Sequence, residues 1–183
     1  LLAVQVLHAD EFQMGVLGAL ETLAFLLIGL PAGAWVDRWR KKRIIVIGDL
    51  SRAALLLTIP IAFLGGVLSM WQLYAVAFAV GCITVFFDVA NQSYLPELVE
   101  GEQISEGNAK LQASQATAAV AGPAMASGLV RVIGAPFAIG VTAACMALSS
   151  LFVSRIRHTE SAVSALDRPP LVGQIREGLA FVL

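Results

Sequence analysis

The sequence predicts an all-α integral membrane protein, a bundle of six helices of which the first is truncated. Of the 183 residues, 58% are hydrophobic and only 14% are charged, and the mean hydropathy is +0.81. A soluble domain carries about 25% charged residues, so this chain has too few polar groups to cover a soluble surface. Its basic residues gather between apolar stretches and not along one face, which argues against binding to nucleic acid.

A membrane span needs about 20 mostly apolar residues. Five stretches meet this length, at residues 12–36, 44–64, 70–89, 108–132 and 135–154. The short apolar run at residues 1–7 is expected to be the tail of an incomplete first span that begins upstream. These elements together form one predicted transmembrane bundle, residues 1–157.

The region after the bundle differs in composition. Residues 158–170 are polar and end in Pro169-Pro170, which indicates a linker. Apolar side chains then recur at helical spacing, at Leu171, Ile175, Leu179 and Val182. We therefore expect residues 158–183 to be a cytoplasmic linker and an amphipathic helix leading to a missing C-terminal half.

The segments between the spans alternate in basic charge. Residues 8–11 and 65–69 contain no Lys or Arg, whereas residues 38–43 contain five of the chain's twelve. Further basic residues on the same side are Lys110, Arg155, Arg157, Arg168 and Arg176. Because short loops rich in Lys and Arg stay in the cytoplasm, we predict a multi-pass protein of the plasma (inner) membrane.

This orientation places the segments 37–43, 90–107 and 155–183 in the cytoplasm. Within the second of them, Pro96 followed by Glu97 suits the first turn of a helix. We expect a short helix to begin there and to lie along the inner membrane surface.

The basic cluster belongs to the sequence motif Gly33-Ala-Trp-Val-Asp37-Arg38-Trp39-Arg40-Lys41-Lys42. It resembles the signature loop of the major facilitator superfamily, G-x-x-x-D-R-x-G-R-R/K, with Arg40 in place of the usual glycine. Further runs resemble the branch that holds the enterobactin exporter and macrolide-efflux-like proteins: Phe86 to Gln92, Leu95 to Val99, Asn108-Ala109 and Gly122-Pro123. The resemblance covers nearly the whole chain and implies the N-terminal six-helix half of a major-facilitator fold.

The resemblance implies a gating role for this loop, at Gly33, Asp37, Arg38, Lys41 and Lys42. Asp37 ends a span, where a carboxylate is unfavourable for its own helix dipole and needs another partner. By the family pattern, Asp37 would lock the two halves together on the inner side, and Lys41 would face Asp88. The alternative is that the basic residues only anchor the loop at lipid headgroups, as we expect for Arg40, Lys42 and Arg43.

Two charges lie inside the third span. Asp49 and Arg52 are three positions apart and so share a helix face. A charge at the centre of a lipid-facing helix costs about 2.5–3.5 kcal/mol, so neither is expected to face lipid. They form with Asp88 a predicted charge network that includes Lys41; a self-contained pair without a gating role stays open as the alternative.

Glu21 and three amides are candidates for a cavity or for coupling. Glu21 is the one carboxylate near the middle of a span, where an ionisable group is a functional candidate. It could carry the coupling proton, or it could be a hydrogen-bonded glutamate that faces the bundle or a cavity. Asn108, Gln112 and Gln115 share one helix face; the alternative is that they bond to neighbouring helices.

Small residues and one proline suggest close packing and a bend. Gly29 and Gly33 are spaced for close helix approach. Gly122, Pro123 and Gly128 belong to a degraded form of the exporter pattern G-P-x-x-G-G, and Pro123 is expected to bend its helix.

These features predict a secondary active transporter, a proton-driven exporter (an antiporter) of a drug, macrolide or siderophore by alternating access. The expected partners are the lipid bilayer, the missing C-terminal half, a small-molecule substrate and protons. We expect no cofactor, metal or nucleic acid.

The alternatives are an uptake carrier of the same fold and a truncated, non-transporting membrane fragment. A membrane-embedded enzyme would need clustered acid–base or metal-binding groups at one depth. His8 and His158 are instead predicted on opposite sides of the membrane.

Overall fold

The computed structural model describes residues 2–36, 39–98 and 104–156, and within them the chain is helical between short connections. The helices are α1 (Leu2–Leu7), α2 (Glu11–Val36), α3 (Lys41–Leu64), α4 (Met70–Leu98), α5 (Ile104–Ile133) and α6 (Ala135–Ser154). Of these, α2 to α6 are long and apolar enough to cross a membrane, and they match the five predicted spans. The predicted all-α membrane fold class is confirmed.

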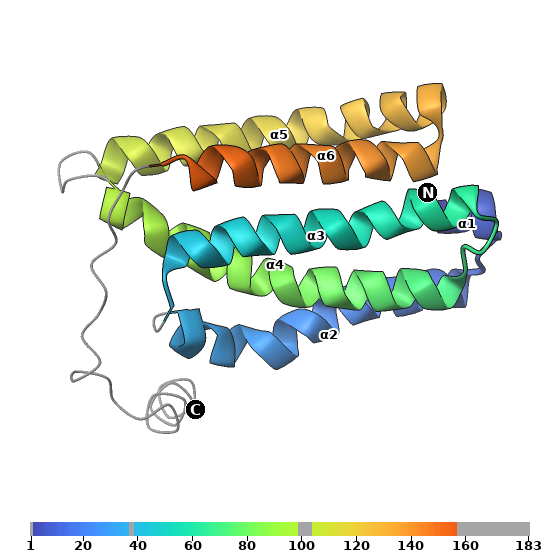
Figure 1. Cartoon of the computed structure of the whole chain (residues 1–183), viewed down its shortest axis with the longest axis horizontal. Coiled ribbons are helices and arrows are strands. Elements are labelled where there is room, and N and C mark those ends of the chain that lie inside the picture. Colours follow the sequence, from blue (N-terminus) through green and yellow to red (C-terminus); the bar gives the residue numbers. More distant parts are fainter. Residues whose placement is uncertain (1, 37–38, 99–103, 157–183) are drawn as a thin grey trace.

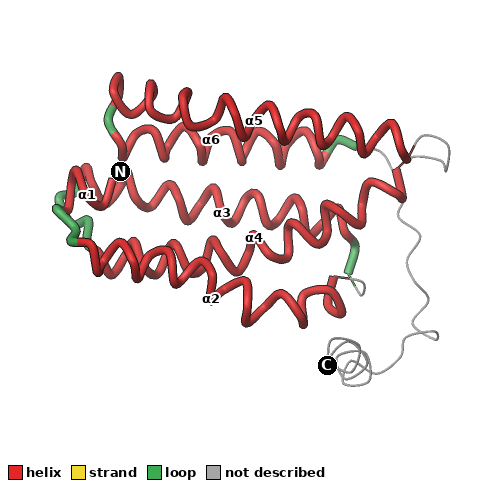
Figure 2. The backbone as a smooth tube through the Cα atoms, turned by 180° about the vertical axis from the view of Figure 1, so that it is seen from behind, coloured by secondary structure: helices red, strands yellow, loops and turns green. Residues whose placement is uncertain are grey.

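The helices run side by side, with α3 and α4 in the middle (Figure 1). Helix α2 packs against α4, and α6 packs against α3, while α5 lies outermost and touches mainly α6. Seen from behind, α1 lies at the end of the bundle that also holds the α3–α4 and α5–α6 connections (Figure 2). Because successive helices run in opposite directions, the start of α3 and the ends of α4 and α6 lie together at the opposite end of the bundle.

The core consists of two apolar clusters, one toward each end of the bundle. The first joins α1 to α3, α4 and α6 through Leu2, Ala3, Ile59, Leu73, Val76 and Ala135. The second joins α2 to α3 and α4 through Val36, Ile45, Ala90 and Tyr94. Between them the helices are held by small residues and by polar contacts.

A glycine sets one of the close helix approaches. A Cβ built on Gly81 of α4 would lie only 3.1 Å from the Cβ of Ala24 on α2, whereas one on Gly140 of α6 would make an ordinary contact of 3.7 Å with Pro60 of α3. In lipid, the hydrophobic effect does not drive helices together, so the association of transmembrane helices depends on close van der Waals packing of this kind. The α5–α6 connection needs glycine for a different reason, because Gly134 has φ 84°.

Helix α2 begins with a reciprocal cap that its sequence encodes. The backbone N–H of Gln13 donates to Asp10 Oδ1 at 2.7 Å, and the N–H of Asp10 donates to Gln13 Oε1 at 3.2 Å. This capping box satisfies two backbone donors that a helix start leaves without partners.

Helix α4 is longer than the sequence predicted. The span was expected to end at residue 89, and a new helix was expected to begin at Pro96, but α4 continues to Leu98. Ala90 and Tyr94, which are 0% and 4% exposed, pack in the second core cluster and so hold this polar stretch in the helix. Residues 90–98 and 104–107 of the segment expected in the cytoplasm are therefore helical, and the cytoplasmic location of this segment stays a prediction.

The predicted linker and amphipathic helix at 158–183 lie outside the described residues, as do Asp37 and Arg38.

Candidate functional site

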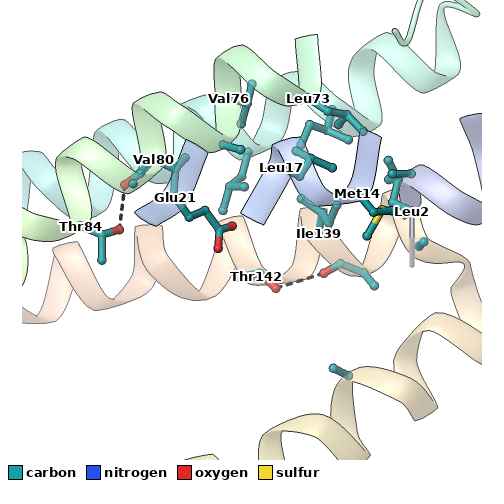
Figure 3. A pocket seen from close by; sticks show the side chains of 18 of the residues that line it. Leu2, Met14, Leu17, Glu21, Leu73, Val76, Val80, Thr84, Ile139 and Thr142 are labelled. Atoms are coloured by element: carbon teal, nitrogen blue, oxygen red, sulfur yellow. Dashed lines mark hydrogen bonds between the residues drawn. The ribbon is translucent and has the colours of Figure 1, made fainter. Parts of the chain in front are cut away.

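A cavity of about 750 Å³ is lined mainly by α2, α4 and α6, and residues of α1, α3 and α5 complete its wall. Most of its wall is apolar, including Met14, Leu17 and Ile139 (Figure 3). The polar side chains on the wall are Glu21, Thr84, Asp88 and Thr142. An apolar hollow with a few polar groups is the usual form of a small-molecule site.

Glu21 projects into this cavity from α2. Figure 3 shows its carboxyl group directed into the space between α4 and α6. No hydrogen bond or ion pair to another described residue holds the carboxyl group, and the side chain is exposed. The structure therefore places Glu21 toward the cavity, and its part in coupling stays a prediction.

The two threonines on the wall bond to their own helices. Thr84 donates to the Val80 carbonyl at 2.8 Å, and Thr142 donates to the Ala138 carbonyl at 3.3 Å (Figure 3). Their methyl groups and hydroxyl oxygens are thereby held in fixed positions beside the cavity.

A charge cluster lies where α3 meets α4 and α6, and it consists of the buried Asp49 and Arg52 with their partners Thr84, Phe87 and Ser149. Asp49 and Arg52 are only 3% and 6% exposed and form an ion pair. The second oxygen of Asp49, Oδ2, accepts a hydrogen bond of 2.7 Å from the Ser149 hydroxyl on α6.

The guanidinium of Arg52 reaches α4. Its Nη1 donates to Thr84 Oγ1 at 3.4 Å, and its central carbon lies 4.0 Å from the centroid of the Phe87 ring. The cation is thus held by a carboxylate, a hydroxyl and an aromatic face, while its Nε has no hydrogen-bond partner among the described residues. The cluster joins α3 to both α4 and α6.

Thr84 belongs to both the cluster and the cavity wall. Asp88, one turn further along α4, also lines the cavity and lies within electrostatic range of Arg52. The structure therefore pairs Asp49 with Arg52 and places Asp88 one turn from their partner Thr84; a charge network that includes Asp88 stays a prediction. Sequence reasoning missed Thr84 and Ser149, because a hydroxyl in an apolar span gives no local signal of its partner.

Lys41 contacts α4 beyond Asp88. Its Nζ donates to the Ser93 carbonyl at 3.4 Å. This contact brings the start of α3 to the end of α4; a pair between Lys41 and Asp88 stays a prediction.

Lys42 has a structural role that the sequence did not reveal. Its Nζ donates to the carbonyls of Ser154 at 2.9 Å and Ile156 at 2.7 Å, at the end of α6. A cation is favourable there because the carbonyls at a helix C-terminus carry partial negative charge. The expectation that Lys42 only anchors the loop at headgroups is therefore wrong.

The polar face of α5 is not part of this site. Asn108, Gln112 and Gln115 are exposed and do not line the cavity. Helix α5 contributes apolar residues instead, at Ala126, Leu129 and Val130. A cavity role for the three amides stays a prediction about contacts beyond the described helices.

The other predicted packing positions face open space. No described atom outside the local helix lies within 4 Å of a Cβ built on Gly29, Gly33, Gly122 or Gly128. Close helix approach through them would need a helix other than the six described here. Helix α5 continues through Pro123, whose carbonyl accepts a 2.7 Å hydrogen bond from the Ser127 hydroxyl.

Long apolar helices around a mainly apolar cavity, with charge confined to helix ends, the cavity wall and one buried cluster, define a multi-pass α-helical membrane protein. Residues 1–177 match the profile of the Major Facilitator Superfamily. The chain belongs to the Major Facilitator Superfamily, a family of transporters, as its loop between α2 and α3 suggested.

Several curated proteins are similar to the chain. It is 29% identical over 162 residues to Macrolide efflux protein A of Enterococcus faecalis, a match covering 87% of this chain and 50% of that protein. The same identity and length hold for Macrolide efflux protein A of Streptococcus pyogenes, of which 40% is covered. An uncharacterized MFS-type transporter of Bacillus subtilis, YfiS, is 24% identical over 184 residues, 99% of this chain and 43% of that protein.

The chain thus spans half or less of the length of these curated relatives. No solved structure matches it significantly.

Proposed function

We propose that this chain is the N-terminal half of a proton-driven secondary transporter that exports a small organic molecule by alternating access. The observation that carries the proposal is the cavity of about 750 Å³ with Glu21 on its wall, in a chain of this superfamily. The similarity to proteins named for macrolide efflux supports a macrolide, another drug or a siderophore as the substrate class.

The walls of the cavity suit an amphiphilic organic molecule. Most of the lining residues are aliphatic, and the polar groups are few and separated. Such a lining binds a large apolar surface and orients it through a small number of polar contacts. Glu21, which has no partner among the described residues, is the proposed carrier of the coupling proton, and Asp88 is the second carboxylate on the same wall.

The cavity is proposed to be completed by a second six-helix half of the same polypeptide. The coverage of 40–50% of the relatives' length supports this arrangement. In it, the exposed amides of α5 (Asn108, Gln112 and Gln115) face the shared space between the two halves.

The gate is proposed at the end of the bundle where α3 begins, which the basic residues orient toward the cytoplasm. Gly33, Asp37, Arg38 and Lys41 form the proposed lock against the second half. Support comes from the way that Lys41 and Lys42 join this loop to the ends of α4 and α6. A change in the loop would thereby be transmitted directly to two spans.

The test is substrate movement in everted membrane vesicles that contain the full polypeptide, with an imposed proton gradient and a labelled macrolide. Glu21→Gln keeps the size of the side chain but cannot release a proton, so gradient-driven transport is expected to be lost. The matched control is Glu106→Gln on α5, because Glu106 is exposed and its one ion pair among the described residues is with the exposed Lys110 at 2.7 Å.

Each other outcome removes one part of the proposal. An equal loss of transport in Glu21→Gln and Glu106→Gln, or no loss in either variant, would show that Glu21 is not the coupling group. Movement in the opposite direction would indicate an uptake carrier. A wild-type protein that moves neither a macrolide nor a siderophore would favour a non-transporting membrane fragment.

A further inference from the structure

A second hollow, separate from the cavity, opens on the side of the bundle. It is a groove of about 650 Å³ between the end of α2 and the first turns of α3, with α4 as its floor. We call it the tryptophan groove, and its lining residues are Trp35, Val36, Trp39, Ile44, Ile47, Gly48, Ser51, Ile83 and Phe86. It shares no residue with the cavity wall, and Ser51 is the one polar residue in its lining.

Two tryptophans form the outer wall of this groove. Trp35 stacks on Phe86 with ring centroids 5.9 Å apart and an interplanar angle of 7°. Trp35 and Trp39 are still 48% and 69% exposed. Tryptophan in this half-buried state is enriched where membrane proteins meet the lipid headgroups, so the groove opens toward lipid at the level of the interface.

Two arginines come just before the groove residues of α3 in the chain. Arg40 precedes α3 and is four positions before Ile44, and Arg43 lies in the first turn of α3, one helical turn before Ile47. Both arginines are exposed, and neither has an ion pair or a side-chain hydrogen bond among the described residues. Their neighbours Lys41 and Lys42 bind instead to the ends of α4 and α6.

We propose that the tryptophan groove is a binding site for an anionic phospholipid, with the acyl chain on the apolar floor and the phosphate at Arg40 and Arg43. Charge complementarity supports this occupant. Guanidinium groups bind phosphate oxygens through paired hydrogen bonds, and basic residues beside membrane spans select anionic lipids. A small soluble anion would account for the arginines and leave the apolar floor unexplained.

The proposal rests in part on the orientation given under the proposed function, which faces this end of the bundle toward the leaflet that holds anionic lipids. The lipid would lie against the end of α2 and the start of α3, and so beside the proposed gate. The proposed lipid site does not depend on the identity of the substrate or of the coupling ion.

The chain offers a built-in probe, because its three tryptophans are Trp35, Trp39 and Trp71. Trp71 begins α4 at the other end of the bundle and is 82% exposed. A Trp71→Phe variant reports only on the groove, and a variant with Trp35→Phe and Trp39→Phe reports only on Trp71. Both are reconstituted as the 183-residue chain, at equal helix content by circular dichroism.

The measurement is quenching of tryptophan fluorescence by lipids brominated on the acyl chains, phosphatidylglycerol against phosphatidylcholine at equal mole fractions. In the Trp71→Phe protein, phosphatidylglycerol is expected to be preferred by about fivefold for each arginine near the surface. Adding Arg40→Gln and Arg43→Gln is expected to abolish the preference. Trp71 alone is expected to be quenched equally by the two lipids.

Three results would overturn the proposal. Equal quenching of the groove tryptophans by both lipids would remove the selectivity, and a preference that survives the two arginine substitutions would remove the binding groups. Quenching of Trp71 without quenching of the groove would mean that protein covers it, either a second copy or another segment of the polypeptide. Since the measurement involves no transport, it can fail while the proposed function stands.

Discussion

Helices α3 and α5 are both long enough to cross a membrane and both carry polar side chains, yet they use them in opposite ways. In α3, 39% of the most apolar stretch is buried, and Asp49 and Arg52 bind partners on α4 and α6. In α5, none of the corresponding stretch is buried, and its three amides are exposed.

The difference separates polar groups that hold the bundle together from polar groups that it presents outward. A buried ion pair with hydrogen-bonded partners costs desolvation, but removing one member costs more, because the other charge stays behind without compensation. An exposed amide can be replaced without leaving a buried charge uncompensated in its own bundle. The comparison therefore predicts large stability effects in and around α3 and small ones in α5.

The largest expected effect comes from Arg52→Met. It leaves the carboxylate of Asp49 buried beside a single hydroxyl donor, and the free energy of unfolding is expected to fall by about 3–5 kcal/mol. The measurement is unfolding in mixed micelles by titration with a denaturing detergent, followed by circular dichroism. The control is the double variant Asp49→Leu with Arg52→Met, which removes both charges and is expected to recover most of the loss. A double variant as unstable as the single one would contradict this account of the cluster.

An intermediate effect is expected from Ser149→Ala. It removes the 2.7 Å hydrogen bond to Asp49 Oδ2, and bonds to charged groups contribute about 1.5–3 kcal/mol. The matched control on the other helix is Ser127→Ala. Within the part of the chain that the structure describes, the Ser127 hydroxyl bonds only to the Pro123 carbonyl of its own helix, and the loss of stability is expected to be within about 0.5 kcal/mol. The same unfolding titration compares the two variants. Similar losses of stability would contradict the distinction between α3 and α5.

The smallest stability effect is expected from the double variant Gln112→Leu and Gln115→Leu in α5. Both side chains are exposed, and the free energy of unfolding is expected to change by about 0.5 kcal/mol or less. Transport of a labelled macrolide by the full polypeptide is the second measurement, and it is expected to fall because these amides are proposed to face the shared cavity. A large loss of stability with transport unchanged would place them in packing instead.

The elements that could be predicted are those with local signals. The five spans follow from apolar runs of sufficient length, and the pairing of Asp49 with Arg52 follows from two charges on one face of an apolar helix. The position of Glu21 in mid-span marked it as a cavity candidate, and it does line the cavity.

The elements that escaped prediction depend on contacts between distant segments. Lys42 was expected to bind lipid headgroups, because it is a cation in a loop between two spans. In the folded bundle, its Nζ instead reaches the end of α6. The polar stretch after residue 89 looked like a loop, and packing of Ala90 and Tyr94 keeps it helical. Ser149 is one of several hydroxyls in apolar spans, and no sequence pattern links it to Asp49.

The bonds of α3 to α6 extend along much of their shared length. Lys42 binds the last carbonyls of α6, Ser149 and Ser150 bond to Asp49 and to the Val46 carbonyl, and Gly140 lies against Pro60. Any rearrangement that preserves these bonds must move the two helices as one stiff rod. Relative motion within the bundle then falls to α5, which lies on the α6 side of the rod, and to α4 and α2, which lie on the α3 side.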